Sequence, residues 1–177
     1  MESAIFKICI FGDGGVGKTT LVNRYISGNF SETTKMTIGV DLATKRIIID
    51  EAKITLQLWD LGGEERFRIF FPAYARGSFG GIFIYDITRY NSLINLDDWL
   101  NIFERGTRSE KYKVPILMVG TKLDLEELRS VTPEDALDRS QNHEIYDLIE
   151  CSSKTGYNVE KIFENITQKI LYSMGLK

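Results

Sequence analysis

The feature that most constrains this chain is a glycine-rich loop at residues 12–19, with the sequence GDGGVGKT, between two apolar segments. Residues 5–11 before the loop are mainly β-branched and aromatic, as in a buried strand. After the loop, apolar residues recur at helical spacing from Leu21 to Ile26. The loop therefore joins a strand to the N-terminus of a helix, which is the setting in which such a loop binds phosphate.

In that setting each residue type of the loop has a physical role. Glycines let backbone N–H groups approach phosphate oxygens, and the helix N-terminus adds partial positive charge. We expect Lys18 to reach the β- and γ-phosphates of a nucleotide and the Thr19 hydroxyl to coordinate Mg²⁺. The residues of this segment that we expect to bind nucleotide are Gly12, Asp13, Gly14, Gly15, Val16, Gly17, Lys18, Thr19 and Thr20.

Composition indicates one globular domain, which we expect to span residues 1–177. The chain is 43% hydrophobic and 27% charged, and its net charge of −3 argues against sequence-independent binding to nucleic acid. Cys9 and Cys151 lie in apolar segments without metal-binding spacing, so we expect reduced core residues and a cytoplasmic protein. His143 is the only histidine and lies in a polar stretch, which disfavours a histidine-centred catalytic site.

The sequence also bears on membranes and assembly. No apolar run reaches the ~18 residues of a membrane-spanning helix. Residues 173–177 include no cysteine for prenylation. We expect a monomer, and peripheral attachment to a membrane stays open.

Apolar runs alternate with helical patterns along the chain, which is typical of an α/β fold. We expect a six-stranded, mostly parallel sheet with helices on both faces. One antiparallel edge strand follows from a hairpin that joins Ile47–Ile49 to Ile54–Leu56 through residues 50–53. The expected strands are residues 5–11, 40–50, 53–60, 81–86, 114–120 and 145–151.

Polar residues follow several of these strands, at the edge where α/β sheets bind ligands. Asp60 ends the run 53–60 and is placed to hold Mg²⁺ through water, and Gly63 offers a backbone N–H to a γ-phosphate. Asp124 follows the run 114–120. A carboxylate accepts the paired donors N1–H and N2–H₂ of guanine, which adenine lacks.

Other residues near Asp124 complete a base pocket. We expect the Lys122 stem to cover one face of the base, in the segment that starts at Thr121. The run 145–151 is followed by Ser152, Ser153 and Lys154, whose backbone amides we expect to meet the guanine O6.

Five further segments complete a family pattern: residues 37–41 (TIGVD), 59–68 (WDLGGEERFR), 85–88 (YDIT), 121–124 (TKLD) and 150–154 (ECSSK). With the glycine loop, they resemble the Ras superfamily of small GTPases, most closely the Rab branch, over residues 5–172. The resemblance implies the P-loop NTPase fold of small G proteins. It also implies a switch that binds GTP or GDP with Mg²⁺, hydrolyses GTP and recruits effectors in membrane traffic or signalling.

The resemblance implies roles for individual residues. Thr37 would be the switch I threonine that coordinates Mg²⁺ and senses the γ-phosphate, Phe30 would stack on guanine, and Gly63 would anchor switch II. Effectors, exchange factors and GTPase-activating proteins would bind switch I (31–42), switch II (63–76) and the interswitch residue Trp59. Leu42, Trp59 and Tyr74 occupy the positions of the interswitch triad of Rab proteins. Hydrolysis would depend on Lys18, Thr37, Gly63 and Glu64.

Glu64 is the departure from the family pattern with most chemical weight. The family usually has a glutamine here, which donates and accepts hydrogen bonds as it orients the attacking water. A carboxylate only accepts, and it adds negative charge beside the γ-phosphate. Either hydrolysis is slow, or Glu64 is held protonated or points away while another group positions the water. We favour slow hydrolysis, because an exposed loop leaves a carboxylate ionised.

Smaller departures carry smaller expectations. Thr121 stands for an asparagine and Ser153 for an alanine, whereas Gly62 replaces an alanine and is expected to loosen switch II. Thr34 stands for a tyrosine that covers the phosphates, so that cover is expected to be missing. A constitutively loaded, non-cycling scaffold remains the alternative function. A P-loop ATPase or kinase is disfavoured by Asp124.

Overall fold

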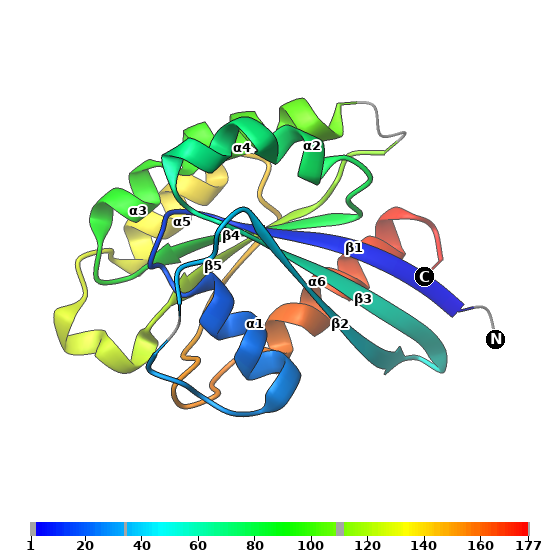
Figure 1. The fold of residues 1–177 in the computed structure, drawn as a ribbon, viewed down its shortest axis with the longest axis horizontal. Helices are drawn as coiled ribbons and strands as arrows, with labels where there is room; N and C mark the ends of the chain where they lie inside the picture. Colours follow the sequence, from blue (N-terminus) through cyan, green and yellow to red (C-terminus); the bar gives the residue numbers. More distant parts are fainter. Residues whose placement is uncertain (1–2, 34, 109–111, 177) are drawn as a thin grey trace.

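The computed structural model describes residues 3–33, 35–108 and 112–176, which form a six-stranded sheet flanked by helices (Figure 1). The strands are β1 (Ser3–Phe11), β2 (Val40–Ile49), β3 (Ala52–Leu61), β4 (Gly80–Asp86), β5 (Ile116–Thr121) and β6 (Asp147–Glu150). Their order across the sheet is β2-β3-β1-β4-β5-β6, and only the β2–β3 pair is antiparallel. The expected α/β fold with one antiparallel edge strand is therefore confirmed.

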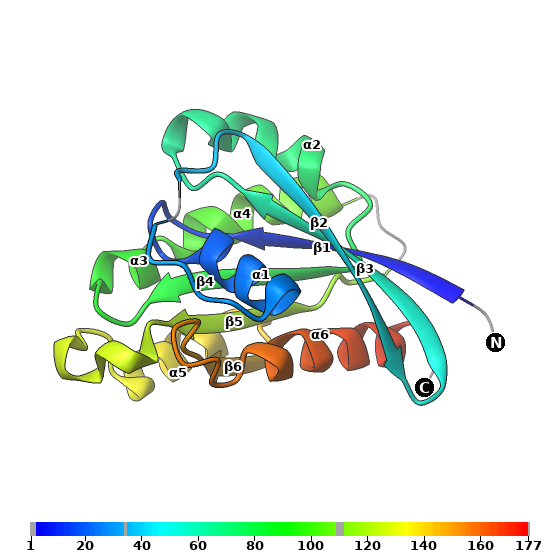
Figure 2. The same cartoon turned by 60° about the horizontal axis from the view of Figure 1, so that its bottom comes forward.

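The edge hairpin is tighter than the sequence indicated. Ile47 pairs with Ile54, and Asp50 and Glu51 alone form the turn, with φ of 47° and 68°. Two consecutive residues in this left-handed conformation make the two-residue turn that fits the twist of paired strands. β3 therefore begins at Ala52, one residue earlier than expected, and the hairpin lies along the edge of the sheet (Figure 2).

Helices cover both faces of the sheet, as expected. α1 (Lys18–Ser27) and α6 (Val159–Ser173) lie on one face. On the other lie α2 (Phe71–Ala75), α3 (Tyr90–Ile94), α4 (Leu96–Thr107) and α5 (Pro133–Gln141). Two short 3₁₀ helices, η1 (Glu65–Phe70) and η2 (Leu123–Leu128), follow β3 and β5. Within the described ranges, none of the helices is both long and apolar enough to cross a bilayer.

Each face of the sheet has its own hydrophobic core. Beneath α1 and α6, the rings of Tyr25 and Phe163 stack with centroids 3.8 Å apart. On the opposite face, Phe11 stacks on Phe103 at 4.9 Å and packs beside Trp99 of α4. Each such side chain, once fully buried, stabilises the fold by about 2 kcal/mol. The apolar faces of these helices therefore form the two cores.

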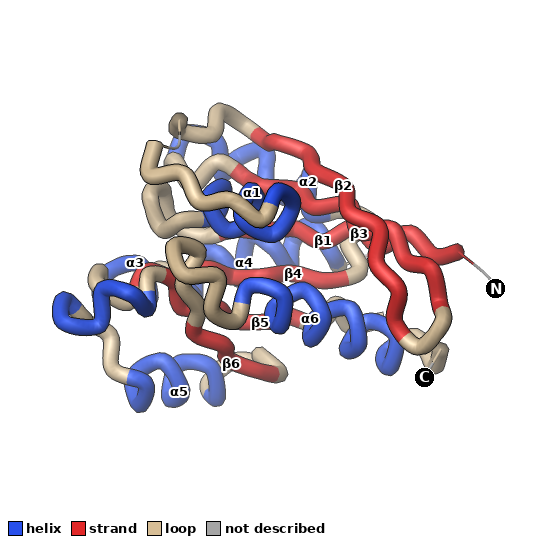
Figure 3. The backbone as a smooth tube through the Cα atoms, turned by 90° about the horizontal axis from the view of Figure 1, so that it is seen from below, coloured by secondary structure: helices blue, strands red, loops and turns tan. Residues whose placement is uncertain are grey.

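The parallel strands bring their carboxyl ends to one edge of the sheet. The glycine loop leaves β1 there, Asp60 lies near the end of β3, and Thr121 ends β5. Figure 3 shows the long loops gathered at this side, at the end of the sheet opposite the N-terminus of the chain. β5 and β6 are displaced or shorter than expected, at 116–121 and 147–150, yet their carboxyl ends still deliver residues 121–124 and 152–154 to this edge.

Candidate nucleotide-binding site

The backbone of the glycine loop requires its glycines. Gly12, Gly15 and Gly17 have φ of 142°, 73° and 100°, which L side chains rarely adopt. A Cβ at Gly12 would also lie 2.2 Å from the Ile84 carbonyl oxygen. The loop thus wraps over the N-terminus of α1, which begins at Lys18.

Lys18 lies inside this loop and is only 5% exposed. Its Nζ donates hydrogen bonds to the carbonyls of Gly12, at 2.8 Å, and Asp13, at 2.6 Å. Burial lowers the pKa of Lys18 to about 8, although the charges of Asp60 and Asp13 oppose the shift. A phosphate bound against the loop would raise the pKa of Lys18 again, because a nearby anion favours the charged ammonium. The position of Lys18 therefore suits the binding of a phosphate.

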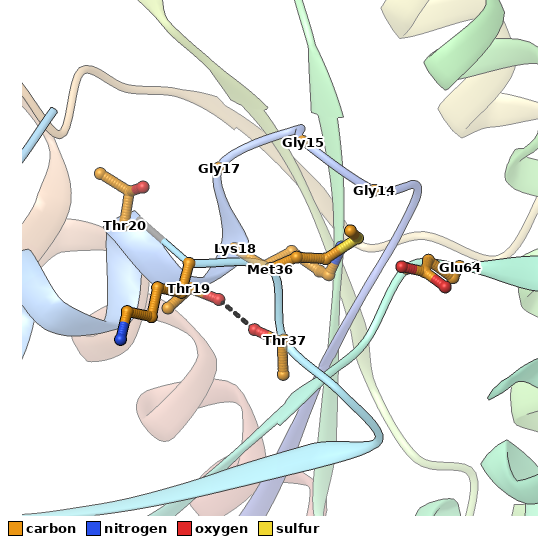
Figure 4. Close-up of a pocket in the computed structure, with 11 residues that line it drawn as sticks. Gly14, Gly15, Gly17, Lys18, Thr19, Thr20, Met36, Thr37 and Glu64 are labelled. Carbon is orange, nitrogen blue, oxygen red and sulfur yellow. Dashed lines mark hydrogen bonds between the residues drawn. The ribbon is translucent and has the colours of Figure 1, made fainter. Parts of the chain in front are cut away.

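The three residues expected at the metal meet beside Lys18. Thr19 Oγ1 lies 2.7 Å from Thr37 Oγ1 and donates to Asp60 Oδ2 at 2.5 Å, while Thr37 Oγ1 lies 3.5 Å from the same carboxylate oxygen. Figure 4 shows the Thr19 and Thr37 hydroxyls pointing toward one another. They come from α1 and from the loop before β2, so tertiary folding brings them together.

Asp60 itself has an incomplete set of partners. It is 2% exposed, and its second oxygen, Oδ1, has no hydrogen-bond partner within the described part of the chain. Burial raises the pKa of Asp60, whereas the Thr19 hydrogen bond and the Lys18 charge lower it. Two hydroxyls and a buried carboxylate with an unsatisfied oxygen are the kind of donors that Mg²⁺ takes, so the residues present fit this ion.

A cavity of about 230 Å³ opens on this cluster (Figure 4). Its walls are the glycine loop, the start of α1, switch I and switch II; the lining residues are Gly14, Gly15, Gly17, Lys18, Thr19, Thr20, Lys35, Met36, Thr37, Gly63 and Glu64. Lys35 and Met36 were given no individual role from the sequence, because exposed loop residues carry no periodic signal.

Switch II begins in tight contact with the glycine loop. A Cβ at Gly63 would lie 2.3 Å from the Gly14 nitrogen and 2.4 Å from the Asp13 carbonyl carbon. Glu64 follows on the Gly14 side of the cavity, and its carboxylate accepts a hydrogen bond from Arg66 in a short ion pair. The residue expected to orient water thus lines the cavity while being held by an exposed arginine.

A second cavity, of about 380 Å³, continues from the first and shares Gly15, Gly17 and Thr20 with it. It collects the residues expected to bind the base: Phe30, Thr121, Lys122, Asp124, Ser153 and Lys154. Asp124 Oδ1 accepts a hydrogen bond from Ser152 Oγ at 2.6 Å. Asp124 itself lines this cavity, so its carboxylate is placed to meet a ligand there.

Two residues tie the base pocket to the glycine loop. Thr121 Oγ1 donates to the Val16 carbonyl at 2.5 Å, and Lys122 Nζ donates to the Gly15 carbonyl at 3.1 Å. Lys122 also pairs with Asp86 at 2.6 Å. Asp86 was not predicted as a site residue, although it lies in the YDIT segment, because its partner is 36 residues away in sequence.

Some expected binding residues face elsewhere. The Ser152 amide does not point to the base pocket, because it donates to the Tyr157 carbonyl at 3.1 Å as the loop closes on itself. Ser152 instead acts through its hydroxyl on Asp124. Val16 is fully buried and presents only its backbone, and the Asp13 carboxylate is engaged by α4 and its preceding residue.

Gly62, which the sequence predicts to loosen switch II, is also in close contact with switch I. Its N–H donates to the Gly39 carbonyl at 2.7 Å, and a Cβ at Gly62 would lie 2.7 Å from the Thr37 carbonyl oxygen. A glycine at position 62 therefore lets switch I pack directly on the residue that precedes switch II, which is a steric reason for the glycine. Thr34, expected to leave the phosphates uncovered, lies outside the described residues.

A parallel sheet whose first strand leads through a glycine loop into α1 defines a P-loop nucleoside triphosphatase. A sequence model described as "Ras family" matches residues 7–172. Ras-related protein RABA1e of Arabidopsis thaliana is 38% identical over 98% of this chain and 78% of its own length. Ras-related protein Rab-11C of Dictyostelium discoideum is 40% identical over 98% of this chain and 75% of its own. The chain therefore belongs to the Ras family of small GTPases, whose members hydrolyse GTP.

Proposed function

We propose that the two continuous cavities bind GTP and GDP, with the phosphates at Lys18 and the base at Asp124. The observation that carries this proposal is the meeting of Thr37 from switch I with Thr19 and Asp60 at the glycine loop. A γ-phosphate at Lys18 would hold Thr37 and Gly63 in place, and its loss on hydrolysis would release both switch segments.

The proposed nucleotide contacts follow the walls of the cavities. Phosphate contacts come from residues 12–20 with Thr37 and Gly63, and base contacts from Phe30, Thr121, Lys122, Asp124, Ser153 and Lys154, with Ser152 acting through Asp124. Because Ser152 donates to Oδ1 of Asp124, the carboxylate is held in place at the wall of the base cavity. That arrangement suits a base with adjacent N–H donors, which favours guanine over adenine.

Thr19, Thr37 and, through water, Asp60 would hold Mg²⁺. When bound, the ion supplies positive charge that neutralises the β- and γ-phosphates. This chain's own residues do the rest: Lys18 binds phosphate oxygens, Gly63 offers its N–H to the γ-phosphate, and Thr37 orders switch I.

Glu64 sets the rate in this proposal. Its carboxylate lines the phosphate cavity and accepts from Arg66, and an ionised carboxylate, unlike an amide, offers no donor to a developing negative oxygen. The Arg66 pair offsets part of its charge but supplies no donor on the cavity side. We therefore propose slow intrinsic hydrolysis and a long-lived GTP state.

Single-turnover hydrolysis of GTP by the Glu64→Gln variant tests this proposal. Removing about 1.4 kcal/mol of repulsion raises the rate tenfold, so we expect an increase of roughly tenfold or more. Glu65→Gln is the matched control, because it removes the same charge from the next, exposed residue. If Glu64→Gln hydrolyses GTP no faster than the parent protein, Glu64 is not the cause of slow hydrolysis. A parent that releases no phosphate under any condition favours the non-cycling scaffold instead.

The switch surface supports a role in recruiting partners. Exposed apolar side chains gather in both switches, at Ile38 and Leu42 in switch I and at Ile69 and Phe70 in switch II. Trp59 packs against Tyr74 with ring centroids 6.2 Å apart. We propose that effectors, exchange factors and GTPase-activating proteins bind switch I, switch II and Trp59 of a cytoplasmic monomer. The Rab names of its relatives support a role in membrane traffic.

A further inference from the structure

The carboxylate of Asp13 points away from the phosphate cavity and collects three donors from other elements. Trp99 Nε1 donates to Oδ1 at 2.8 Å, and Asn95 Nδ2 donates to Oδ2 at 2.7 Å. Arg68 Nη2 of switch II donates to Oδ1 at 3.3 Å. The Asp13 side chain is only 17% exposed, so these bonds are largely shielded from water.

Arg68 is held on a second side by the same tryptophan. Its guanidinium lies over the Trp99 ring, 4.5 Å from the centroid, and its side chain is 21% exposed. Within the described ranges, its buried Nε has no hydrogen-bond partner. The position of Arg68 therefore depends on Asp13 and on the face of Trp99, with few alternatives nearby.

Asp13 is thus attached to switch II at two points. Gly63 packs on its backbone, and Arg68 pairs with its carboxylate. Between these points lies Glu64, in a turn that the Phe67 amide closes by donating to the Glu64 carbonyl at 3.0 Å. Glu64, the residue proposed to face the γ-phosphate, therefore lies between Gly63 and Arg68, which both contact Asp13.

We propose that Asp13 is a positioning residue, whose contact with Arg68 fixes residue 64 at the phosphate cavity and couples α4 to the switch. The four residues Asp13, Arg68, Asn95 and Trp99 are named here the Asp13 clamp. Asn95 precedes α4 and Trp99 lies in its first turns, so the clamp joins the glycine loop, switch II and α4. The inference deepens the proposed function and rests on the assignment of residue 64 to the γ-phosphate side.

A carboxylate is required because it alone serves all three donors. An asparagine at position 13 offers one acceptor oxygen and no charge, and its NH₂ faces donors rather than acceptors. Arg68 makes the longest of the three bonds and depends most on charge, so it is the partner that Asp13→Asn releases.

The kinetic test uses the Glu64→Gln protein, in which hydrolysis is expected to be fast enough to show a loss. Asp13→Asn and Arg68→Gln are each expected to lower its single-turnover rate by about ten- to a hundredfold, as displacement of a positioned group by about 1 Å does. The double variant is expected to be no slower than either single one, because both break one contact. Arg68→Lys, which keeps the charge, is expected to recover part of the rate.

Asp97→Asn is the matched control, because Asp97 lies in α4 but pairs with Arg139 instead of the glycine loop. GDP affinity is measured in every variant, so that a rate lost through weak binding is recognised. The clamp is overturned if Asp13→Asn and Arg68→Gln lower the hydrolysis rate of the Glu64→Gln protein additively. It is also overturned if neither substitution changes that rate.

A second readout separates the clamp from hydrolysis. In a Trp59→Phe background, Trp99 is the remaining tryptophan, and its indole lies between the Asp13 carboxylate and the Arg68 cation. Asp13→Asn and Arg68→Gln are expected to change its emission, whereas Asp97→Asn is not. If the emission changes but no variant hydrolyses GTP, the clamp stands and the proposed function fails. Emission that is the same in all three variants overturns the clamp whatever the kinetics.

Discussion

Replacing Gly63 with alanine disturbs the contact on which the switch depends. An ideal Cβ at this position lies 2.3 Å from the Gly14 nitrogen, 2.4 Å from the Asp13 carbonyl carbon and 2.6 Å from the Asp13 oxygen. Ordinary contact begins near 3.4 Å, so the glycine loop and switch II must separate by about 1 Å. The neighbouring atoms are all backbone, so no side chain can turn aside to make room.

The size of the effect follows from that separation. Overpacking of this kind costs about 1–3 kcal/mol of folding free energy. A displacement of about 1 Å between substrate and catalytic groups costs up to about 10²-fold in rate. We therefore expect Gly63→Ala to lower single-turnover GTP hydrolysis in the Glu64→Gln protein by roughly a hundredfold. The γ-phosphate should also lose most of its effect on switch II.

The assay pairs hydrolysis with hydrogen exchange of residues 63–76 in the GDP and GTPγS forms. The parent is expected to show stronger protection with GTPγS, and Gly63→Ala about equal protection in both. Gly14→Ala is the control for unfolding by urea, because its Cβ would lie 4.0 Å from the nearest atom, in ordinary contact. A Gly63→Ala protein that keeps the parent's rate and its protection difference refutes the reasoning.

Two further predictions concern the base pocket and the buried thiols. Ser152→Ala removes the hydroxyl that holds Asp124 at 2.6 Å, so GDP should bind about five- to tenfold more weakly in a fluorescent-nucleotide titration; unchanged affinity contradicts this role. Burial raises the pKa of Cys9 from 9.0 to about 11, so the folded state keeps the proton that the unfolded state loses. The contribution of the protonated Cys9 thiol to the free energy of unfolding is fully present below pH 9. It is lost as the pH rises through 11, which lowers the free energy of unfolding by about 3 kcal/mol. In urea unfolding, the free energy of unfolding should fall less between pH 8 and pH 11 for Cys9→Ala than for the parent protein. Equal decreases in the two proteins would contradict this role of Cys9.

The elements that sequence reasoning predicted well are those whose signal is local. Residues 5–11 and the glycine loop specify a strand, a turn and a helix start within a few positions. The start of α5 depends on an equally local signal: Thr132 precedes Pro133, and its Oγ1 accepts a hydrogen bond from the Asp135 amide at 3.1 Å. The strand ends then follow from topology, because parallel strands share one carboxyl edge.

The features that escaped prediction depend on contacts between distant segments. Asp13 reads as a loop residue, but its carboxylate serves Asn95 and Trp99, which are 82 and 86 positions away. The Ser152 amide was expected to meet the base, but the loop closure onto Tyr157 uses it. A steric reason for Gly62 also comes from a distant segment, because the Thr37 carbonyl packs closely against it. Such details follow from tertiary packing, which residue spacing does not encode.

The most direct test of the central proposal is to denature the protein, purified without added nucleotide, and identify what it releases by chromatography. A guanine-nucleotide switch with slow hydrolysis predicts guanine nucleotide alone, with a measurable share of GTP beside GDP. The Glu64→Gln protein, treated in the same way, should release a smaller share of GTP. Release of adenine nucleotide from either protein would contradict the assignment of the base pocket and, with it, the proposed function.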